Sequence, residues 1–420
     1  MKHFINKGII FLVLIFAASQ GNAQFSLSAD LRPRTELSHG YKELADQNQK
    51  ASLFTSQRTR LNLHYSTEKI KTKLVLQDVR LWGSQPQLVA NEDYGVSVHE
   101  AWAEAFFTDN FSLKAGRQEV VYDDHRIFGN VGWAQQGRSH DLFKVKYENK
   151  INAHLGFAYH ENDNRKNNIY QGPDAYKSMQ YLWLNKEWDS FELSFLALNV
   201  GLPVNAVIDS LGNVLKEEII FNQTFGLYLK YQTTEKLNFA ANSYLQTGKD
   251  GMENDLMAYE FAIQTGYKIN EQYHASLRYE MLSGNDQQII NQENNAFNPL
   301  FGTNHKFNGH MDYFYVGNHT VSVGLQDISA SMKYTKNNFR SKLTGHYFAS
   351  AAEPGYGEDR YLGTELDLMV GYKVNEMVDI SCGYSHMFAG ETMELLKGGN
   401  KDEANYWGWL MIGFSPVFIN

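Results

Sequence analysis

Residues 221–239, "FNQTFGLYLKYQTTEKLNF", contain an alternating segment, a short polar turn and the start of a second segment. Successive side chains of an extended strand point to opposite faces, so alternation assigns each residue to a face. The first face is apolar and carries Phe221, Phe225, Leu227 and Leu229. The second face is largely polar and carries Asn222, Thr224, Tyr228 and Lys230. This pattern predicts a strand that separates an apolar medium from water.

The same turn layout recurs along the chain. An aromatic residue, a few polar residues and a new apolar or aromatic residue occur in sequence, starting at Tyr65, Phe107, Tyr147, Trp188, Tyr231, Tyr267, Tyr334 and Tyr372. The spacing is roughly 40 residues with one larger gap, and longer polar stretches lie between the turns. Short turns at one end and long loops at the other are typical of a transmembrane β-barrel. The eight short turns join nine up-and-down hairpins. This predicts an all-β chain folded as one antiparallel barrel of about 18 strands, with short periplasmic turns and long extracellular loops.

The N-terminus indicates export. Lys2 and Lys7 precede the apolar stretch "GIIFLVLIFAA", which is too short to span a bilayer, and "GNA" ends at Ala23. We therefore expect residues 1–23 to be a signal peptide and residues 24–420 to form the barrel in the outer membrane of a Gram-negative bacterium. The tyrosines next to the short turns would then form a girdle at one membrane surface, in contact with outer-membrane lipid.

Composition excludes several classes of protein. The net charge of −9 disfavours nucleic acid as a partner, which requires a basic surface. The single cysteine, Cys382, rules out an intramolecular disulfide. A soluble β-propeller or sandwich remains the alternative fold, although it would not place aromatic residues at one fixed level.

One stretch concentrates opposite charges. Residues 116–141, "GRQEVVYDDHRIFGNVGWAQQGRSHD", contain three arginines and several acids separated by glycines and aromatics. A catalytic site, a metal site and the charged constriction of a pore are the three hypotheses for it. We expect residues 119–137 to fold into the lumen, where paired charges would be partly structural. That fold would bring Arg126 and Asp123 or Asp124 close to Arg58, Arg60 and Arg138.

This stretch, together with "QRTRLNL" at 57–63 and "LQDVRLWG" at 76–83, resembles the alginate-export family of outer-membrane proteins. The resemblance implies an 18-stranded barrel with an arginine-rich constriction that contains some acids. It implies solute contacts by Arg58, Arg60, Arg117, Arg126 and Arg138. It also implies that three acids shape the constriction, namely Asp123, Asp124 and Asp141.

Alternation adds residues to the predicted lumen. Glu100, Glu104 and Arg278 fall on the inward face, where basic residues somewhat outnumber acids. Asp78 and Arg80 match the family motif but fall on the outward face, so a bulge or a loop position would be needed to bring them inward. The long stretch 283–318 is rich in Asn and Gln, and we expect it opposite the girdle tyrosines, folded over the mouth or poorly ordered.

No catalytic motif is present in the chain. There is no Gly-x-Ser-x-Gly or His-Glu-x-x-His sequence, and we expect neither an enzyme, a metal site nor a cofactor. The sequence predicts an outer-membrane channel that passively exports or passes anionic solutes, such as saccharides of the alginate type. A general porin with weak selectivity, or a surface scaffold or adhesin, is the alternative. Expected partners are lipid, an anionic saccharide or other small solute, and periplasmic export proteins.

Overall fold

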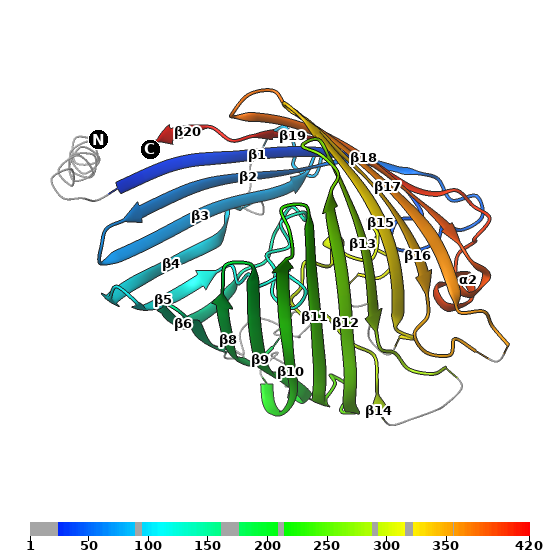
Figure 1. The fold of residues 1–420 in the computed structure, drawn as a ribbon, viewed down its shortest axis with the longest axis horizontal. Coiled ribbons are helices and arrows are strands. Elements are labelled where there is room, and N and C mark those ends of the chain that lie inside the picture. The colour runs from blue at the N-terminus through cyan, green and yellow to red at the C-terminus, as the bar shows by residue number, and fades with distance from the viewer. Residues whose placement is uncertain are drawn as a thin grey trace.

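The computed structural model describes residues 24–88, 95–160, 176–208, 214–287, 293–315, 322–355 and 357–420. Within these ranges the chain forms one closed antiparallel β-barrel, which confirms the predicted fold class (Figure 1). The predicted signal peptide, residues 1–23, lies outside the described residues.

In the described part of the chain, 18 strands form the wall. The first nine are β1 (Gln24–His39), β2 (Ser52–Ser66), β3 (Ile70–Leu81), β4 (Ser97–Thr108), β5 (Phe111–Gln118), β6 (His140–Glu148), β7 (Asn152–Tyr159), β8 (Ser178–Glu187) and β9 (Phe191–Ile208). The others are β10 (Val214–Gln232), β11 (Leu237–Lys249), β12 (Asp255–Lys268), β13 (Tyr273–Leu282), β15 (Leu325–Lys336), β16 (Phe339–Ala349), β17 (Tyr361–Lys373), β18 (Val378–Ala389) and β19 (Asn405–Phe414). Four short elements complete the described structure: β14 (Glu293–Asn294), η1 (Asn304–Lys306), α2 (Glu391–Lys397) and β20 (Val417–Ile419). Among the described residues, no helix is long and apolar enough to cross a membrane.

The barrel closes where the first strand meets the last. β1 pairs with β2 along its whole length, but it pairs with β19 only between Leu31 and His39. Beyond Phe414 the chain continues as the three-residue β20, which pairs with β1 at Leu27 and Ser28 across a register shift. This seam joins the two ends of the described chain, which lie side by side in Figure 1.

The two ends of the barrel differ in their connections. Within the described residues, eight short turns join strands at one end, which we call the turn end. The strands are joined by longer connections at the other end, which we call the loop end, as between β5 and β6 and between β13 and β15. The six tyrosines predicted to form a girdle are all within a few residues of a short turn: Tyr65, Tyr147, Tyr231, Tyr267, Tyr334 and Tyr372. The predicted single level of tyrosines is confirmed.

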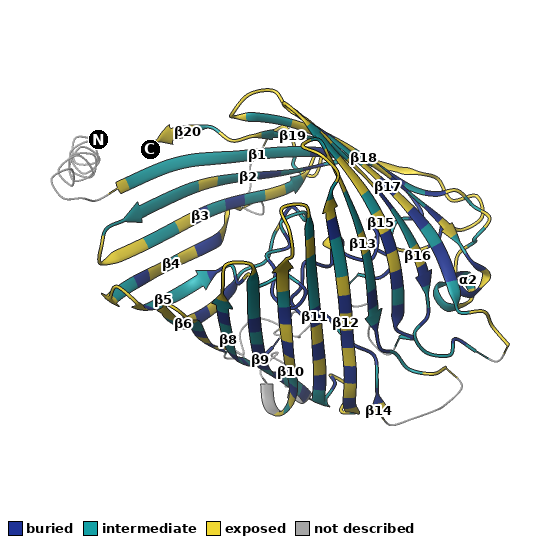
Figure 2. Cartoon of the chain, in the orientation of Figure 1, coloured by how far each residue is buried: buried dark blue, intermediate teal, exposed yellow. Residues whose placement is uncertain are grey.

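The wall strands alternate between an exposed outer face and an inner face. Figure 2 shows this as bands of exposed and buried residues along β10, β11 and β12. Phe225 and Leu227 are 42% and 50% exposed, whereas Thr224 and Tyr228 are buried. The apolar face therefore points to lipid and the polar face to the interior, as the alternation in 221–230 predicts.

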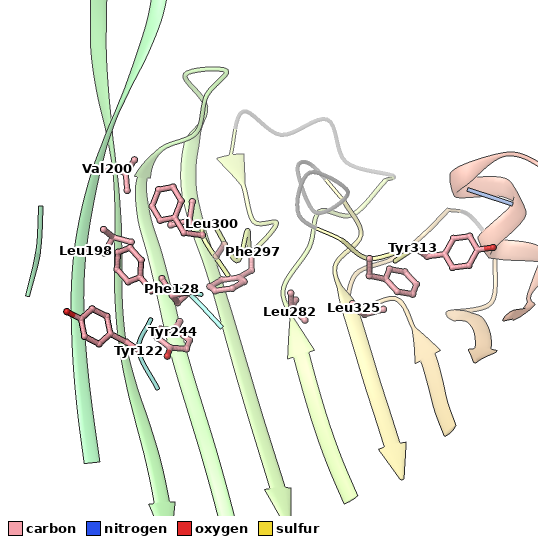
Figure 3. Close-up of a cluster of buried hydrophobic side chains, with 14 of the residues drawn as sticks. Tyr122, Phe128, Leu198, Val200, Tyr244, Leu282, Phe297, Leu300, Tyr313 and Leu325 are labelled. Carbon is pink, nitrogen blue, oxygen red and sulfur yellow. The ribbon is translucent and has the colours of Figure 1, made fainter. Parts of the chain in front are cut away.

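The interior contains two segments that fold in from the loop end. The first inserted segment, residues 119–139, connects β5 to β6, and the second, residues 293–315, belongs to the connection between β13 and β15. A bridge between Phe128 and Phe301 joins them. Figure 3 shows Phe128 and Phe297 beside Leu198 and Tyr244 of the wall, so the two segments share an apolar core inside the barrel. The predicted entry of residues 119–137 into the lumen is confirmed. Residues 293–315 start from the predicted end, opposite the girdle tyrosines, but they lie inside the barrel rather than over its mouth.

Candidate functional site

Four arginines lie together on the lumen face of β1 and β2, and we call them the arginine group: Arg32, Arg34, Arg58 and Arg60. The register places Arg32 directly opposite Arg58 on the neighbouring strand. Like charges in directly opposite positions destabilise a sheet. The arrangement therefore needs either local compensation or a function that retains it.

Carboxylates compensate only part of the arginine group. Three of its members have acidic partners, with N–O distances of 2.8 Å for Arg58–Asp30, 2.9 Å for Arg34–Glu36 and 3.9 Å for Arg60–Glu119. Arg32 instead donates to the backbone oxygens of Gly132, Trp133 and Ala134 at 2.9–3.1 Å. Among the described residues no carboxylate forms an ion pair with Arg32, so the group and its partners carry a net positive charge.

A second basic group continues around the same wall on β3, β5 and β6. Glu100 and Glu104 of β4 point inward between its members, as predicted. Glu100 pairs with Lys73, and Glu104 accepts from Lys146 Nζ at 3.0 Å. The basic residues of this group are Lys73, Lys114, Lys144 and Lys146. Lysines thus outnumber the inward acids on β3–β6 as well.

Arg126 anchors the first inserted segment to the second and to the wall. Its side chain is fully buried, with Nε 3.0 Å from Oε1 of Glu280, which is also fully buried. Its terminal nitrogens donate to Asn304 and Asn308 of the second segment at 3.1 Å each. The guanidinium carbon lies 4.7 Å from the centre of the Phe307 ring. All three nitrogens therefore face protein groups, and Arg126 holds the segments in place rather than facing the open lumen.

Asp123 and Asp124 come just before Arg126 on the same segment, and they contact another part of the wall. Asp123 accepts from the Trp183 indole at 3.0 Å, and Asp124 accepts from Asn242 Nδ2 at 2.8 Å. Lys306 of the second segment donates to the backbone oxygen of Asp124 at 2.8 Å. Burial raises the pKa of Asp123 to about 6, and the neighbouring charge of Asp124 adds to the increase. These acids lie inside the barrel, as the constriction hypothesis requires.

Arg138 and Arg278 also lie inside the barrel. Arg138 Nη1 donates to the backbone oxygen of Gly302 at 3.1 Å, which links the end of the first segment to the second. Arg278 extends inward from β13, as the alternation predicts, and its Nη2 lies 2.9 Å from Glu280. Both residues therefore support the inserted segments.

The structure corrects the predicted placement of Arg117 and Asp141. They pair with each other at 2.8 Å, with side chains 40% and 58% exposed. On β5, Ser112 faces inward to Glu104, so Arg117 at an odd offset from it faces outward. Asp141 lies directly opposite Arg117 on β6 and shares that outer face. The two residues form a pair on the outside of the barrel near its loop end, away from the lumen.

A second correction concerns Arg126 and its neighbours. The first inserted segment does enter the lumen, but it spans between two parts of the wall. Its residues 132–135 contact the arginine group, whereas Arg126 contacts Glu280 on β13. The predicted approach of Arg126 and the adjacent acids to Arg58 and Arg60 is therefore wrong. Asp78 and Arg80 pair with each other at 2.6 Å on the outward face, where the alternation places them.

Sequence reasoning missed Arg34, Glu36 and the aromatic contact between the segments. Arg34 and Glu36 continue the alternation of β1 beyond Arg32, so counting two residues further would have found them. The ring of Trp133 lies 4.2 Å from the Arg34 guanidinium and stacks on His305 at 4.8 Å. No local signal could pair Trp133 with His305, because they come from different loops.

Buried acids of the wall hold the second inserted segment. Five carboxylates on β12, β13, β15 and β17 are at most 2% exposed: Glu260, Glu280, Asp327, Glu365 and Asp367. The backbone N–H of Met311 donates to Glu365 at 2.8 Å, and Asn308 donates to Asp327 at 3.2 Å. His310 lies 3.8 Å from Asp367. These acids are covered by protein, whereas several side chains of the two basic groups remain partly exposed. The acids of β12–β17 therefore face the second inserted segment rather than the open lumen.

A cavity of about 830 Å³ lies below the inserted segments and reaches the short turn between β8 and β9. Asp123 and Asp124 of the first segment and Lys306 and Phe307 of the second line it from above. Its side walls include inward residues of β9–β13: Glu192, Tyr228, Lys230, Asn242, Gln264 and Arg278. The cavity is thus polar, contains both signs of charge and lies on a different part of the wall from the arginine group.

A sequence model of the family described as alginate export matches residues 221–406. The predicted resemblance to the alginate-export family is confirmed. The match extends from β10 to β19 and does not include 57–83 or 116–141, where the family motifs were identified. The family match therefore lies in the second half of the chain. No curated protein matches the chain.

Solved outer-membrane proteins share the fold. OprD of Pseudomonas aeruginosa is 11% identical, with 96% of each chain covered and a TM-score of 0.63. OccAB4 of Acinetobacter baumannii is 12% identical, with 94% of this chain and 98% of that chain covered and a TM-score of 0.61. OccK11 of Pseudomonas aeruginosa is 10% identical, with 95% and 97% covered and a TM-score of 0.61. At these identities the likeness concerns the fold. The barrel and the family match together identify an outer-membrane β-barrel channel of a Gram-negative bacterium.

Proposed function

We propose that the barrel passively exports or passes anionic solutes, in particular acidic saccharides of the alginate type. The observation that carries the proposal is the direct opposition of Arg32 and Arg58 on the lumen face. The same arrangement recurs where Lys114 lies opposite Lys144. Repeated like-charge pairs cost stability, and a negatively charged solute that binds in front of both side chains reduces their repulsion.

The surroundings support a path for anions along β1–β6. Clustered positive charge in a narrow, low-dielectric channel raises the local concentration of anions. The acids Glu100, Glu104 and Glu119 lie among these bases and limit how tightly a polyanion is held. Weak, repeated binding is what conduction requires, because a solute must also leave each site.

The test compares two double substitutions of equal charge. Arg58→Gln with Arg60→Gln removes two positive charges from the lumen. Arg117→Gln with Arg80→Gln removes two from the outer face, where both side chains pair with neighbouring acids. The reversal potential in a planar bilayer, under a salt gradient at low ionic strength, reports anion over cation permeability. We expect the lumen variant to lose much of its anion preference and the outer variant to keep it.

Three outcomes discriminate the alternatives. A folded wild-type channel with no anion preference would indicate a general porin. Absence of any conductance would favour the scaffold or adhesin hypothesis. An anion preference that survives the lumen substitutions would mean that the two arginines serve only to pair with acids.

A further inference from the structure

Two residues that line the cavity below the inserted segments carry buried polar atoms without a hydrogen-bond partner among the described residues. Asn242 is 4% exposed and lines the cavity, and its Oδ1 has no hydrogen-bond partner within the described residues. Its Nδ2 donates to Asp124 Oδ2 at 2.8 Å. Exchanging the amide oxygen and nitrogen would place an oxygen against the Asp124 carboxylate, so this hydrogen bond fixes the orientation. A buried acceptor is therefore unpaired at this site.

An unpaired donor lies in the same cavity. Arg278 also lines it, and its Nε is buried without a hydrogen-bond partner in the described structure, although Nη2 contacts Glu280. Lys306 uses its ammonium group to donate to the backbone oxygen of Asp124, which leaves further protons on that group. Donors and acceptors thus occur side by side around one space.

We propose that this cavity is a saccharide subsite that recognises sugar hydroxyl groups, separate from the arginine group. Each hydroxyl can donate to the carboxylates of Asp123 or Asp124 and accept from Lys306 or the terminal nitrogens of Arg278, which matches the mixed lining, and Asn242 holds Asp124 in place. The volume of about 830 Å³ lies within the range of ligand pockets and accommodates a short oligosaccharide. The inference rests on the proposed saccharide channel and deepens it.

The lining disfavours the simpler ligands. A small inorganic anion would meet the carboxylates of Asp123, Asp124 and Glu192. Among the described residues, no group of three His, Cys, Asp or Glu side chains could hold a metal ion. A hydroxyl-rich ring, by contrast, uses both the acidic and the basic side chains. A carboxylate on that ring would find Lys306 above the cavity and Arg278 in its side wall.

Titration of an acidic trisaccharide into the purified detergent-solubilised barrel tests the proposal. Trp183 contacts Asp123, and Trp188 lines the cavity, so tryptophan fluorescence reports binding in parallel with calorimetry. Asn242→Ala should weaken binding about tenfold, which corresponds to about 1.4 kcal/mol. The matched control is Asn222→Ala, another buried inward asparagine whose Oδ1 lacks a partner but which does not line the cavity. It should bind like the wild type.

A second variant distinguishes a loss of binding from a loss of folding. Lys306→Gln changes an exposed side chain on the second segment and should weaken binding several-fold in a barrel that migrates normally on a gel without boiling. Excess inorganic phosphate should not displace the trisaccharide. Absence of binding to the wild type, equal binding by Asn242→Ala and wild type, or full displacement by phosphate would each overturn the proposal.

The outcome is separable from that of the proposed function. Anion preference is measured with the Arg58→Gln and Arg60→Gln variant, whereas the subsite is measured by trisaccharide affinity. A channel that keeps its anion preference but shows no trisaccharide binding removes this inference alone. Trisaccharide binding without anion preference removes the proposed selectivity and leaves the subsite.

Discussion

Replacing Arg126 with Met should release the first inserted segment from the wall and increase channel opening. Arg126 contacts Glu280 at 3.0 Å and donates to Asn304 and Asn308, and it has no exposed side-chain surface. Methionine fills much of the space but offers no donor. The substitution leaves Glu280 buried without its principal cation.

The magnitude follows from what remains around Glu280. Removing one partner of a buried ion pair costs about 3–5 kcal/mol. Glu280 keeps the Arg278 guanidinium at 2.9 Å and the Asn308 amide, so the cost should lie near the lower limit. About 3 kcal/mol corresponds to roughly a 150-fold larger population with the segment undocked. Arg126→Lys retains a charge near Glu280 and should give an intermediate increase.

Single-channel recording and limited proteolysis measure this population. Openings to a larger conductance should become on the order of 100-fold more frequent in Arg126→Met, and residues 119–139 should become sensitive to protease. Arg117→Met is the matched control, because that arginine pairs with Asp141 on the outer face. Exposed pairs contribute at most about 1 kcal/mol, so the control should resemble the wild type. Equal opening frequencies and protease resistance in the two variants would refute the anchoring role of Arg126.

Three further predictions concern separate parts of the barrel. Because the pKa of Asp123 is raised to about 6 in the folded protein, its contribution to stability is full below its unfolded pKa near 3.9 and is lost as pH rises to about 6. An asparagine cannot ionise, so the Asp123→Asn variant should gain stability over the wild type at pH 7 but not at pH 4, by up to about 3 kcal/mol. Equal shifts in melting temperature between the two proteins at both pH values would contradict this. Leu277→Arg places a charge at a 64% exposed position midway along the outer face, and it should lower the yield of folded barrel in lipid vesicles, with a cost of about 2–4 kcal/mol; an unchanged yield would count against a lipid-facing position. Trp133→Ala removes the ring between Arg34 and His305 and should increase conductance, whereas a wild-type conductance would show that the two segments remain joined without it.

The wall was predictable because its signals are local. Alternation and the recurring turns gave the strand number, the tyrosine level and the inward positions of Arg58, Arg60, Glu100, Glu104 and Arg278. A two-residue period needs only neighbouring residues and is fixed by the geometry of an extended chain. The same period predicts an outward Asp78 and Arg80, which the structure confirms.

The interior was less predictable because its contacts are long-range. Arg126 and Glu280 are 154 positions apart, and several inward acids could have paired with that arginine. For Arg117, the alternation from the inward Lys114 indicates the outer face, while the family resemblance implied the lumen. The structure agrees with the alternation. Resemblance to a family motif therefore does not specify which face of the wall each residue occupies.

The seam between β1 and β19 has a consequence for the order of assembly. Its pairs, such as Leu31 with Phe414, join residues about 380 positions apart, whereas Ser66 and Lys71, paired across a short turn, are only about 5 positions apart. On a logarithmic closure law, closing the seam costs about 4 kcal/mol more in chain entropy than closing one hairpin. Contacts of such separation form slowly, so every hairpin can exist before the ring closes. Closure of the β1–β19 seam would then limit the rate of barrel assembly in the membrane. A defect at the seam would slow assembly while leaving the conductance of completed barrels unchanged.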